Sequence, residues 1–324
     1  MIKLIRYIAV GVLPCLLAAA PAQAADPGPM RLVVPFSAGG GTDAVARAVA
    51  QGLSNRLGQQ MIVENRPGAG GSIGTTVVAQ APADGLTLLL GSNGTMVLNP
   101  LLYNNLRYQV DKDFIPVGGI AAVPYLVATN LQFDARDIKG LLEKAKAKPG
   151  TVTFASPGRG TTNHLAGVLL ESRGGVKMTH VPYRGAALGM NDVAAGMVNF
   201  MSGDIGTLLP MVKSGKLHAL AVTGKERVAI LPDVPTVAET LPGYEATGWF
   251  GIFVRRGTPQ AAIDRVQAEL GRVLAEPAVV QRLESIGAAP MPMDTAALAR
   301  LIAAESTKWK KVITDNKIAV DALQ

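Results

Sequence analysis

RLVVPFSAGGGTDAVARAVAQG, residues 31–52, joins an apolar run to an amphipathic segment through three consecutive glycines. The apolar run predicts a buried strand, and the spacing of Val45, Val49 and Leu53 predicts a helix. One glycine would make the turn, whereas three let backbone N–H groups approach a bound group closely. The helix start adds unpaired donors and about half a positive charge. The stretch therefore predicts either an anion-binding loop or a cramped turn that only glycine fits.

The second half of the chain repeats this plan. Residues 151–172, TVTFASPGRGTTNHLAGVLLES, show the same order of strand, Gly-rich loop, threonine and helix. Two further pairs match in the same order, about 110–120 residues apart: 61–81 with 178–198, and 88–97 with 199–209. Strand-like runs that alternate with helical patterns indicate parallel βαβ units. The sequence therefore predicts an α/β fold of two similar lobes.

Two strand-like segments suit a chain that passes between these lobes. They are residues 114–130, with a proline in the middle, and residues 244–259, after a Pro-rich connection. We expect the crossings near Val123 and Tyr244. Lobe 1 then comprises residues 25–123 and 246–324, and lobe 2 comprises residues 124–245. Two crossings predict a hinge.

The chain beyond Pro259 is predicted to be entirely helical and amphipathic, and to pack back on lobe 1. Its last long helix is expected from Asp294 to about Asp315.

A ligand cleft is expected between the lobes, because ligands of open α/β sheets bind at the carboxyl ends of the strands. This arrangement makes the glycines of residues 36–43 one wall of the site. The loops expected to face one another are 36–43, 68–73 and 92–95 from lobe 1, and 156–162, 183–187 and 202–207 from lobe 2.

The first residues are typical of a targeting segment. Lys3 and Arg6 precede an apolar stretch, and the small-residue sequence Ala22-Gln23-Ala24 follows it. This pattern predicts a secretory signal peptide, residues 1–24, and a periplasmic mature protein. The one cysteine, Cys15, lies inside the segment, so no disulfide or thiolate chemistry is expected afterwards.

Composition argues against several other classes of function. The formal net charge is +7, but the cations are spread along the chain and form no basic stripe with aromatic partners. Nucleic-acid binding is therefore not expected. No cofactor is expected, because GAGGSI lacks the third glycine of the dinucleotide fingerprint and no Walker sequence occurs. The three histidines match no metal motif, and the protein is expected to act as a monomer.

An enzyme remains an alternative at this point. Residues 70–74, Gly-Gly-Ser-Ile-Gly, match the nucleophile elbow of serine hydrolases, which makes Ser72 a candidate nucleophile. An elbow needs a strand that runs directly into the serine, and here a separate loop intervenes. A binding protein for phosphate-like anions is a third alternative.

Several stretches taken together resemble one family, the Bug-type extracytoplasmic solute receptors of tripartite tricarboxylate transporters. The resemblance covers essentially the whole mature chain and implies an exported binding protein with a type II periplasmic-binding fold. The matching stretches are PFSAGGGTDAVAR (35–47), NRPGAGGSIGT (65–75), ADGLTLLLGS (83–92), HLAG (164–167), HVPYRGAA (180–187) and GWFGIFVRRGTP (248–259).

The resemblance implies a small organic carboxylate, delivered to a membrane transporter or presented to a sensor. Backbone amides of the two first-lobe glycine loops would hold it, together with groups from lobe 2. By position the contacts are Phe36, Gly40, Gly41, Thr42, Ala69, Gly70, Gly71, Ser92, Ser156, Thr161, Thr162, Tyr183, Arg184, Gly185 and Asp204.

Three charged residues in these loops have two interpretations each. Asp43 precedes Arg47 by four residues, which favours an ion pair at the helix start, although a ligand amine would also suit it. Asp204 either accepts a hydrogen bond from a ligand hydroxyl or amine, or caps the turn that follows. Arg184 either pairs with a distal carboxylate of the ligand or serves the architecture.

Overall fold

The computed structural model describes residues 28–183 and 185–318. The predicted signal peptide and Arg184 lie outside the described residues. No helix in the described part of the chain has the length and hydropathy needed to cross a membrane.

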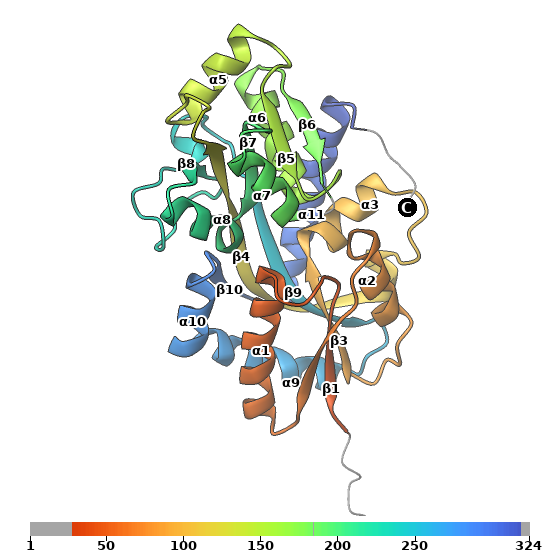
Figure 1. Cartoon of the computed structure of the whole chain (residues 1–324). Coiled ribbons are helices and arrows are strands. Elements are labelled where there is room, and N and C mark those ends of the chain that lie inside the picture. Colours follow the sequence, from red (N-terminus) through yellow and green to blue (C-terminus); the bar gives the residue numbers. More distant parts are fainter. Residues whose placement is uncertain (1–27, 184, 319–324) are drawn as a thin grey trace, which may run out of the picture.

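The first βαβ units form one part of the sheet (Figure 1). Strands β1 (Met30–Val34), β2 (Met61–Asn65) and β3 (Thr87–Ser92) are parallel, with β1 in the middle. Helices α1 (Gly41–Leu57) and α2 (Ser72–Ala79) connect them. Successive residues of β1 face opposite ways: Leu32 and Val34 belong to the core that contains Val45 of α1, and Val33 to the core that contains Val78 of α2. Burial on both faces explains the continuous apolar run.

The second part of the sheet has the same plan, which confirms the predicted repeat. Strands β5 (Thr153–Ser156), β6 (Thr179–Pro182) and β7 (Phe200–Asp204) are parallel, with β5 in the middle. Helices α6 (Thr162–Gly174) and α7 (Ala186–Ala194) connect them. Strand β8 (Leu217–Val222) and helices α5 (Ile138–Ala147) and α8 (Ile205–Lys213) complete this lobe.

One long strand, β4 (Phe114–Asn130), passes through both parts, as predicted for residues 114–130. Its first half pairs antiparallel with β9 (Thr247–Arg255) as far as Pro124, and β7 becomes a neighbour from Tyr125 onward. Strand β9 also pairs with β3, and β8 lies on the other side of β4. The change of partner at Pro124 and Tyr125 falls beside the predicted crossing, while the lobe boundaries themselves stay a prediction.

Thr223 connects the two crossing segments. Its Oγ1 accepts from the N–H of Tyr125 at 2.8 Å and donates to the carbonyl of Ala246 at 2.7 Å. Its own N–H donates to the carbonyl of Tyr125 at 2.9 Å, and the N–H of Ala246 donates to its carbonyl at 3.0 Å. The outgoing and returning chains are therefore held side by side at one point.

The prediction of an entirely helical tail is wrong in one place. Between α10 (Pro277–Glu284) and α11 (Thr295–Asp315), the chain forms β10 (Ala289–Met293), antiparallel to β4. The strand was not predicted because its sequence, APMPM, contains two prolines, Pro290 and Pro292. Proline lacks an N–H but is tolerated on an edge strand, where half of the donors are unpaired.

The last long helix is also placed differently from the expectation. Helix α11 begins after Asp294, whose side chain accepts from the N–H of Ala297, as a capping residue does. It packs along β4, and the residues that follow it, up to Ile318, reach the lobe-2 helix α6 (Figure 1). The tail therefore contacts both lobes and not lobe 1 alone.

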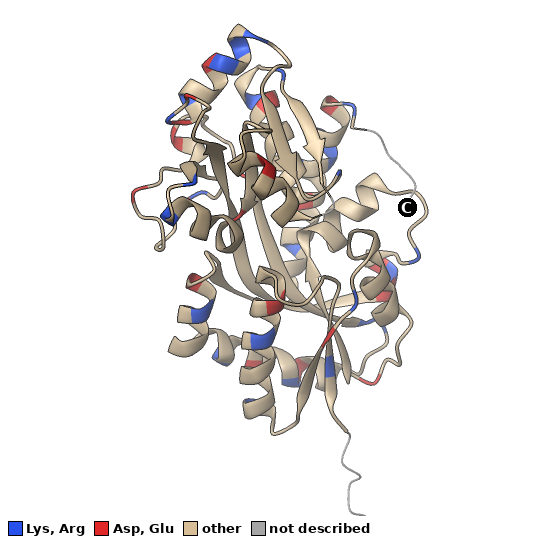
Figure 2. Ribbon diagram, in the orientation of Figure 1, with Lys and Arg blue, Asp and Glu red and all other residues tan. Residues whose placement is uncertain are grey.

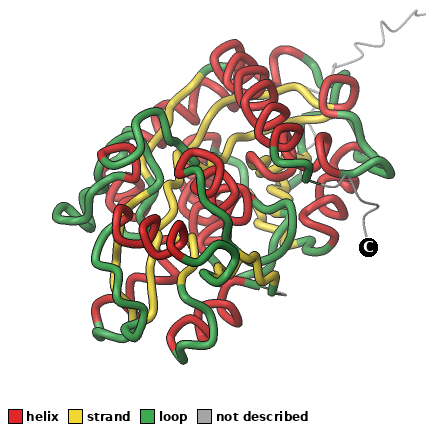
Figure 3. Tube along the Cα trace, turned by 90° about the horizontal axis from the view of Figure 1, so that it is seen from above, coloured by secondary structure: helices red, strands yellow, loops and turns green. Residues whose placement is uncertain are grey.

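Helices cover both faces of the sheet when the molecule is seen from above (Figure 3). Lys and Arg are interspersed with Asp and Glu over the outer helices of both lobes (Figure 2). The remaining helical elements are α9 (Gln260–Leu274), η1 (Ala69–Gly71), η2 (Gly94–Leu98), α3 (Asn99–Leu102), α4 (Val110–Asp113) and η3 (Val237–Glu239).

Candidate functional site

A cavity of about 240 Å³ lies between the lobes, beside the point where β4 changes partners. Loops from both lobes line it at the carboxyl ends of their strands, as the topology predicts. Seven of the predicted contacts line this cavity: Phe36, Thr42, Gly70, Ser92, Thr161, Thr162 and Asp204.

The other described candidates do not line this cavity. Gly41 borders an adjoining cavity of about 30 Å³, together with Thr42 and Asp204. The remainder lie in the same segments but do not line this cavity: Gly40, Asp43 in the first turn of α1, Ala69 and Gly71 in η1, Ser156 at the end of β5, Tyr183 and Gly185.

Gly70 lines the cavity from lobe 1, and it stands in a segment, residues 69–71, with an unusual backbone conformation. Ala69, Gly70 and Gly71 all have positive φ, of 47°, 60° and 89°. A Cβ on Gly71 would come within 2.7 Å of Thr95, and its N–H already donates to the carbonyl of Gly68. Gly71 is therefore explained by packing. Gly70 is different, because it lines the cavity and has only the Asn99 side chain near its missing Cβ, at 3.6 Å.

Asn99 stabilises the loop that contains Gly70 through hydrogen bonds of its side chain. Its Nδ2 donates to the carbonyl of Gly70 at 3.0 Å and to Oγ of Ser72 at 3.2 Å, and its side chain is 4% exposed. The sequence offered no sign of this role, since Asn99 follows the Ser92 loop and not a glycine loop.

Asp43 has the structural role that its spacing favours. Its carboxylate accepts from the N–H of Gly39, from Nε of Arg47 and from Nδ2 of Asn65, at 2.9–3.0 Å. Burial acts to raise the pKa of Asp43, but these hydrogen bonds outweigh it and lower the pKa. These bonds favour the ion-pair interpretation of Asp43, and its contact with a ligand amine stays a prediction.

The start of α6 forms the lobe-2 wall. Thr161 caps the helix, because its Oγ1 accepts from the N–H of His164 at 3.2 Å. Thr162 and Asn163 follow in the first turn, and Nδ2 of Asn163 donates to the carbonyl of Ser202 at 3.2 Å. The helix start therefore faces the cavity with its unpaired backbone donors.

Arg159 supplies a cation on the same wall, at a position that no sequence motif singles out. It lines the cavity from the loop before α6.

Two histidines lie near this wall. Burial is the main cause that lowers the pKa of His164 to about 3 and of His180 to about 4, so both are uncharged near neutral pH. Ser156 lies behind them, within 2.7 Å of Nε2 of His180.

Two buried side chains at the cavity have polar atoms without a partner among the described residues. They are both amide atoms of Asn93, which is 1% exposed, and Nε1 of Trp249, which is 3% exposed. Buried polar groups are normally hydrogen-bonded, and exceptions are frequent at functional sites. Neither residue was named as a contact, although Asn93 lies in the predicted loop 92–95 and Trp249 in the family-like stretch 248–259.

Ser72 is not arranged as a nucleophile elbow. Strand β2 ends at Asn65, so a loop separates it from the serine, whose Oγ accepts from Asn99. The ring nitrogens of the three histidines form hydrogen bonds within the fold: His164 with the N–H of Gly160, His180 with the hydroxyl of Ser156, and His218 with the carbonyl of Arg136. In the described part of the chain, no three His, Cys, Asp or Glu residues are grouped to hold a metal ion.

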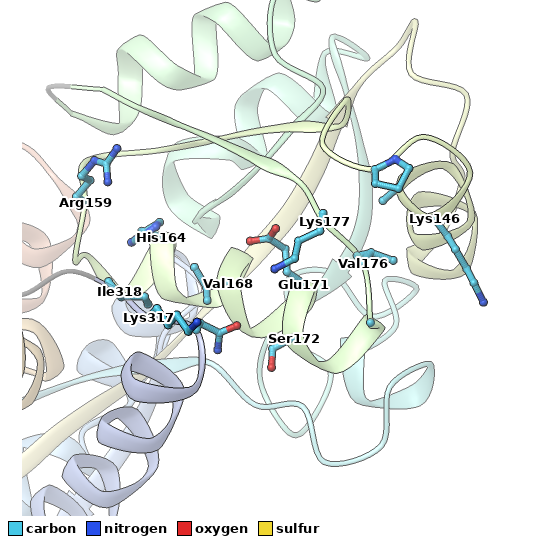
Figure 4. A pocket seen from close by; sticks show the side chains of 14 residues that line it. Lys146, Arg159, His164, Val168, Glu171, Ser172, Val176, Lys177, Lys317 and Ile318 are labelled. Carbon is cyan, nitrogen blue, oxygen red and sulfur yellow. The ribbon is translucent and has the colours of Figure 1, made fainter.

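A larger cavity, of about 590 Å³, lies on the outer side of α6 (Figure 4). Lys146, Lys177 and Lys317 line it together with Glu171, and Arg159 borders both cavities. The carboxylate of Glu171 accepts from the N–H of Met178 at 2.6 Å. This cavity is formed by lobe 2 and the end of the tail and lies outside the interlobe cleft.

Asp204 is expected to make stability depend on pH. Burial raises its pKa above the ordinary 3.8. Below pH 3.8 the carboxyl is protonated in both states and has no effect; as the pH rises, the folded protein resists ionisation and loses stability. Asp204→Asn removes this cost, so the variant is expected to be the more stable by about 1–3 kcal/mol at pH 7 and to lose the advantage near pH 4.

Urea unfolding at several pH values measures the difference. Asp111→Asn, which changes an exposed carboxylate, is the control for the loss of one charge. A difference between Asp204→Asn and the parent protein that does not change with pH contradicts the assignment.

The sequence matches the family model "Tripartite tricarboxylate transporter family receptor" over residues 45–318. The "UPF0065 protein in tcbD-tcbE intergenic region" of Pseudomonas sp. (strain P51) is 39% identical, with 90% of this chain and 87% of the relative covered. Protein BugT of Bordetella pertussis is 34% identical, with 89% of each chain covered.

Solved structures agree with this match. "R. palustris Rpa4515 with adipate" superposes with a TM-score of 0.84 at 34% identity, over 90% of this chain and 98% of the other. "MatC (Rpa3494) from Rhodopseudomonas palustris with bound malate" gives 0.78 at 33% identity, over 89% and 99%. The alkanesulfonate-binding protein SsuA of Xanthomonas axonopodis, at 15% identity and a TM-score of 0.55 over 93% and 97%, shares the fold alone.

Proposed function

Because this chain belongs to the tripartite tricarboxylate transporter receptor family, we propose that it captures a small organic carboxylate in the cavity between its lobes. Receptors of this family are periplasmic and bind carboxylates. Two relatives were solved with adipate and with malate, which supports the same class of ligand here.

The observation that carries the proposal is that two helix N-termini meet at one cavity. Thr42 in the first turn of α1 and Thr162 in the first turn of α6 both line it. No cationic side chain lies in residues 35–43 or 68–73, so an anion on the lobe-1 wall must be held by backbone N–H groups and helix dipoles. Gly70 lets the anion approach that wall.

Arg159 is the cation that we propose for a second carboxylate at the opposite wall. Its planar guanidinium can donate two parallel hydrogen bonds to one carboxylate. Arg184, the cation predicted for this purpose, remains a second candidate.

Closure of the lobes is part of the proposal. A carboxylate held by lobe 1 alone would stay open to water, where hydrogen bonds contribute little net free energy. The crossing segments tied by Thr223 are the natural hinge, because lobe 2 is joined through β4 and the return chain. A signal peptide that directs export, and delivery to a membrane transporter or a sensor, complete the proposed role.

Thermal shift and solution scattering test the proposed function. At a ligand concentration of about 100 times Kd, binding stabilises the folded state by roughly 2.7 kcal/mol. We expect such shifts with members of a panel of mono-, di- and tricarboxylates, and a smaller radius of gyration with the ligand that shifts most. Succinamide, the uncharged counterpart of succinate, is the control and is expected to give no shift.

Two outcomes contradict the proposal. One is stabilisation by phosphate or methylphosphonate and by no carboxylate, which favours a phosphate-type receptor. The other is ester hydrolysis that Ser72→Ala abolishes, which favours an enzyme.

A further inference from the structure

Asp204 places a carboxylate at the junction of the two interlobe cavities. It is the last residue of β7, directly opposite Tyr125 of β4 in the register of the sheet. It borders both the cavity of about 240 Å³ and the adjoining one of about 30 Å³. Its neighbours there include Thr42 at the start of α1 and the aromatic ring of Phe250.

The fold gives this carboxylate no described partner. Asp204 stands at the N-cap position of α8, but its side chain accepts no hydrogen bond from the N–H groups of that helix. No ion pair joins it to Arg159, the described cation on the same cavity. The Tyr125 hydroxyl lies nearby, but no hydrogen bond joins it to Asp204 among the described residues. The side chain of Asp204 therefore makes no capping bond in this structure, and it borders the cavity.

A half-buried carboxylate that lacks both a donor and a cation is unfavourable, and proteins normally supply one of the two. No described residue does so for Asp204, and the cavity that it borders is where a ligand group can. A ligand carboxylate placed against Asp204 would add repulsion between like charges, whereas a hydroxyl or ammonium group would supply the missing donor. The carboxylates of the ligand are then directed to the helix starts and to Arg159.

We propose that Asp204 accepts a hydrogen bond from a hydroxyl or ammonium group of the ligand, so that the receptor selects hydroxy- or amino-carboxylic acids over the plain acids. This inference rests on the proposed function and adds the chemical class of the ligand. It explains why a carboxylate is present in a cavity that otherwise attracts anions.

Matched ligands that differ by one donor test the proposal. Succinate, malate and aspartate form one series; glutarate, 2-hydroxyglutarate and glutamate form a second; propionate, lactate and alanine form a third. We expect at least one hydroxy or amino acid to bind about tenfold or more tightly than its plain counterpart by titration calorimetry.

Two substitutions at Asp204 then separate the two donors. Asp204→Ala removes the acceptor and is expected to reduce the preference to less than about twofold. Asp204→Asn keeps a neutral acceptor, so it retains a preference for a hydroxyl but loses one for an ammonium group. Asp134→Ala, an exposed change on the same lobe, is the control and is expected to keep the parent preference. Unfolding curves establish that each variant is folded.

The inference is overturned if the plain acids bind as tightly as their hydroxy and amino counterparts, or if Asp204→Ala leaves the preference unchanged. In both cases carboxylates still bind, so the proposed function stands. If no carboxylate in the three series or the wider panel binds, the proposed function fails and this inference fails with it.

Discussion

Gly70→Val is expected to weaken carboxylate binding by about a hundredfold or more. Hydrogen bonds to a charged group contribute about 1.5–3 kcal/mol each, and a branched side chain at Gly70 keeps the anion away from the lobe-1 donors. We expect the variant to fold, because a Cβ at this position meets only the side chain of Asn99, at 3.6 Å. Titration with the ligand that gives the largest thermal shift measures the loss.

Gly58→Val is a closely matched control for backbone strain. Gly58, at the end of α1, has φ 60° and ψ 25°, the same values as Gly70, and no atom within 4 Å of a built Cβ. Both variants are expected to lose about 1–2 kcal/mol of stability, because each forces a branched residue into the left-handed region. Only Gly70→Val is expected to lose affinity. Equal affinity in the two variants contradicts the assignment of this wall.

Trp309→Ala is expected to lower the free energy of unfolding by about 3–5 kcal/mol. The side chain of Trp309 is 0% exposed, and its Nε1 donates to Glu305 at 2.7 Å on the previous turn of α11. Removing the ring leaves a large cavity along β4 and removes one of the two donors of Glu305, the other being Lys308. Urea unfolding measures the loss, with the exposed Lys310→Ala as control. A loss below about 1 kcal/mol would mean that α11 is only loosely attached to the core.

Local patterns were enough to predict most of the fold. The apolar runs of β1 and β3, the spacing of Val45 and Val49, and the internal repeat specify the βαβ units. Strand β10 was not predicted, because prolines oppose strand formation everywhere except at the edge of a sheet. That edge exists only once β4 is in place. The reach of α11 across both lobes is likewise a tertiary property, since its amphipathic pattern fits any apolar surface.

The sequence was enough to predict which loops form the candidate site, but not which side chains of those loops line the cavity. The sequence placed Gly70 and Thr161 in facing loops, and both line the cavity. It favoured the ion pair of Asp43 with Arg47, but it could not show the further hydrogen bonds of Asp43 to Gly39 and Asn65. Nor could it bring Asn93 and Trp249 together, because more than one hundred and fifty residues of chain separate them. Which side chains reach a shared cavity depends on how β4, β7 and β9 twist past one another.

The shared strand β4 also has a consequence for the order of folding. Strand β9 lies between β3 and β4, so the first sheet is completed only by residues that follow the whole of lobe 2. Bringing such distant segments together is slow, because the chain entropy of a long loop must be lost before the contacts form. Once lobe 2 is folded, its two ends are neighbours, since Pro124 pairs with Thr247 and Val123 with Gly248. The inserted lobe can therefore act as a template that aligns β4 and β9 for the rest of the protein.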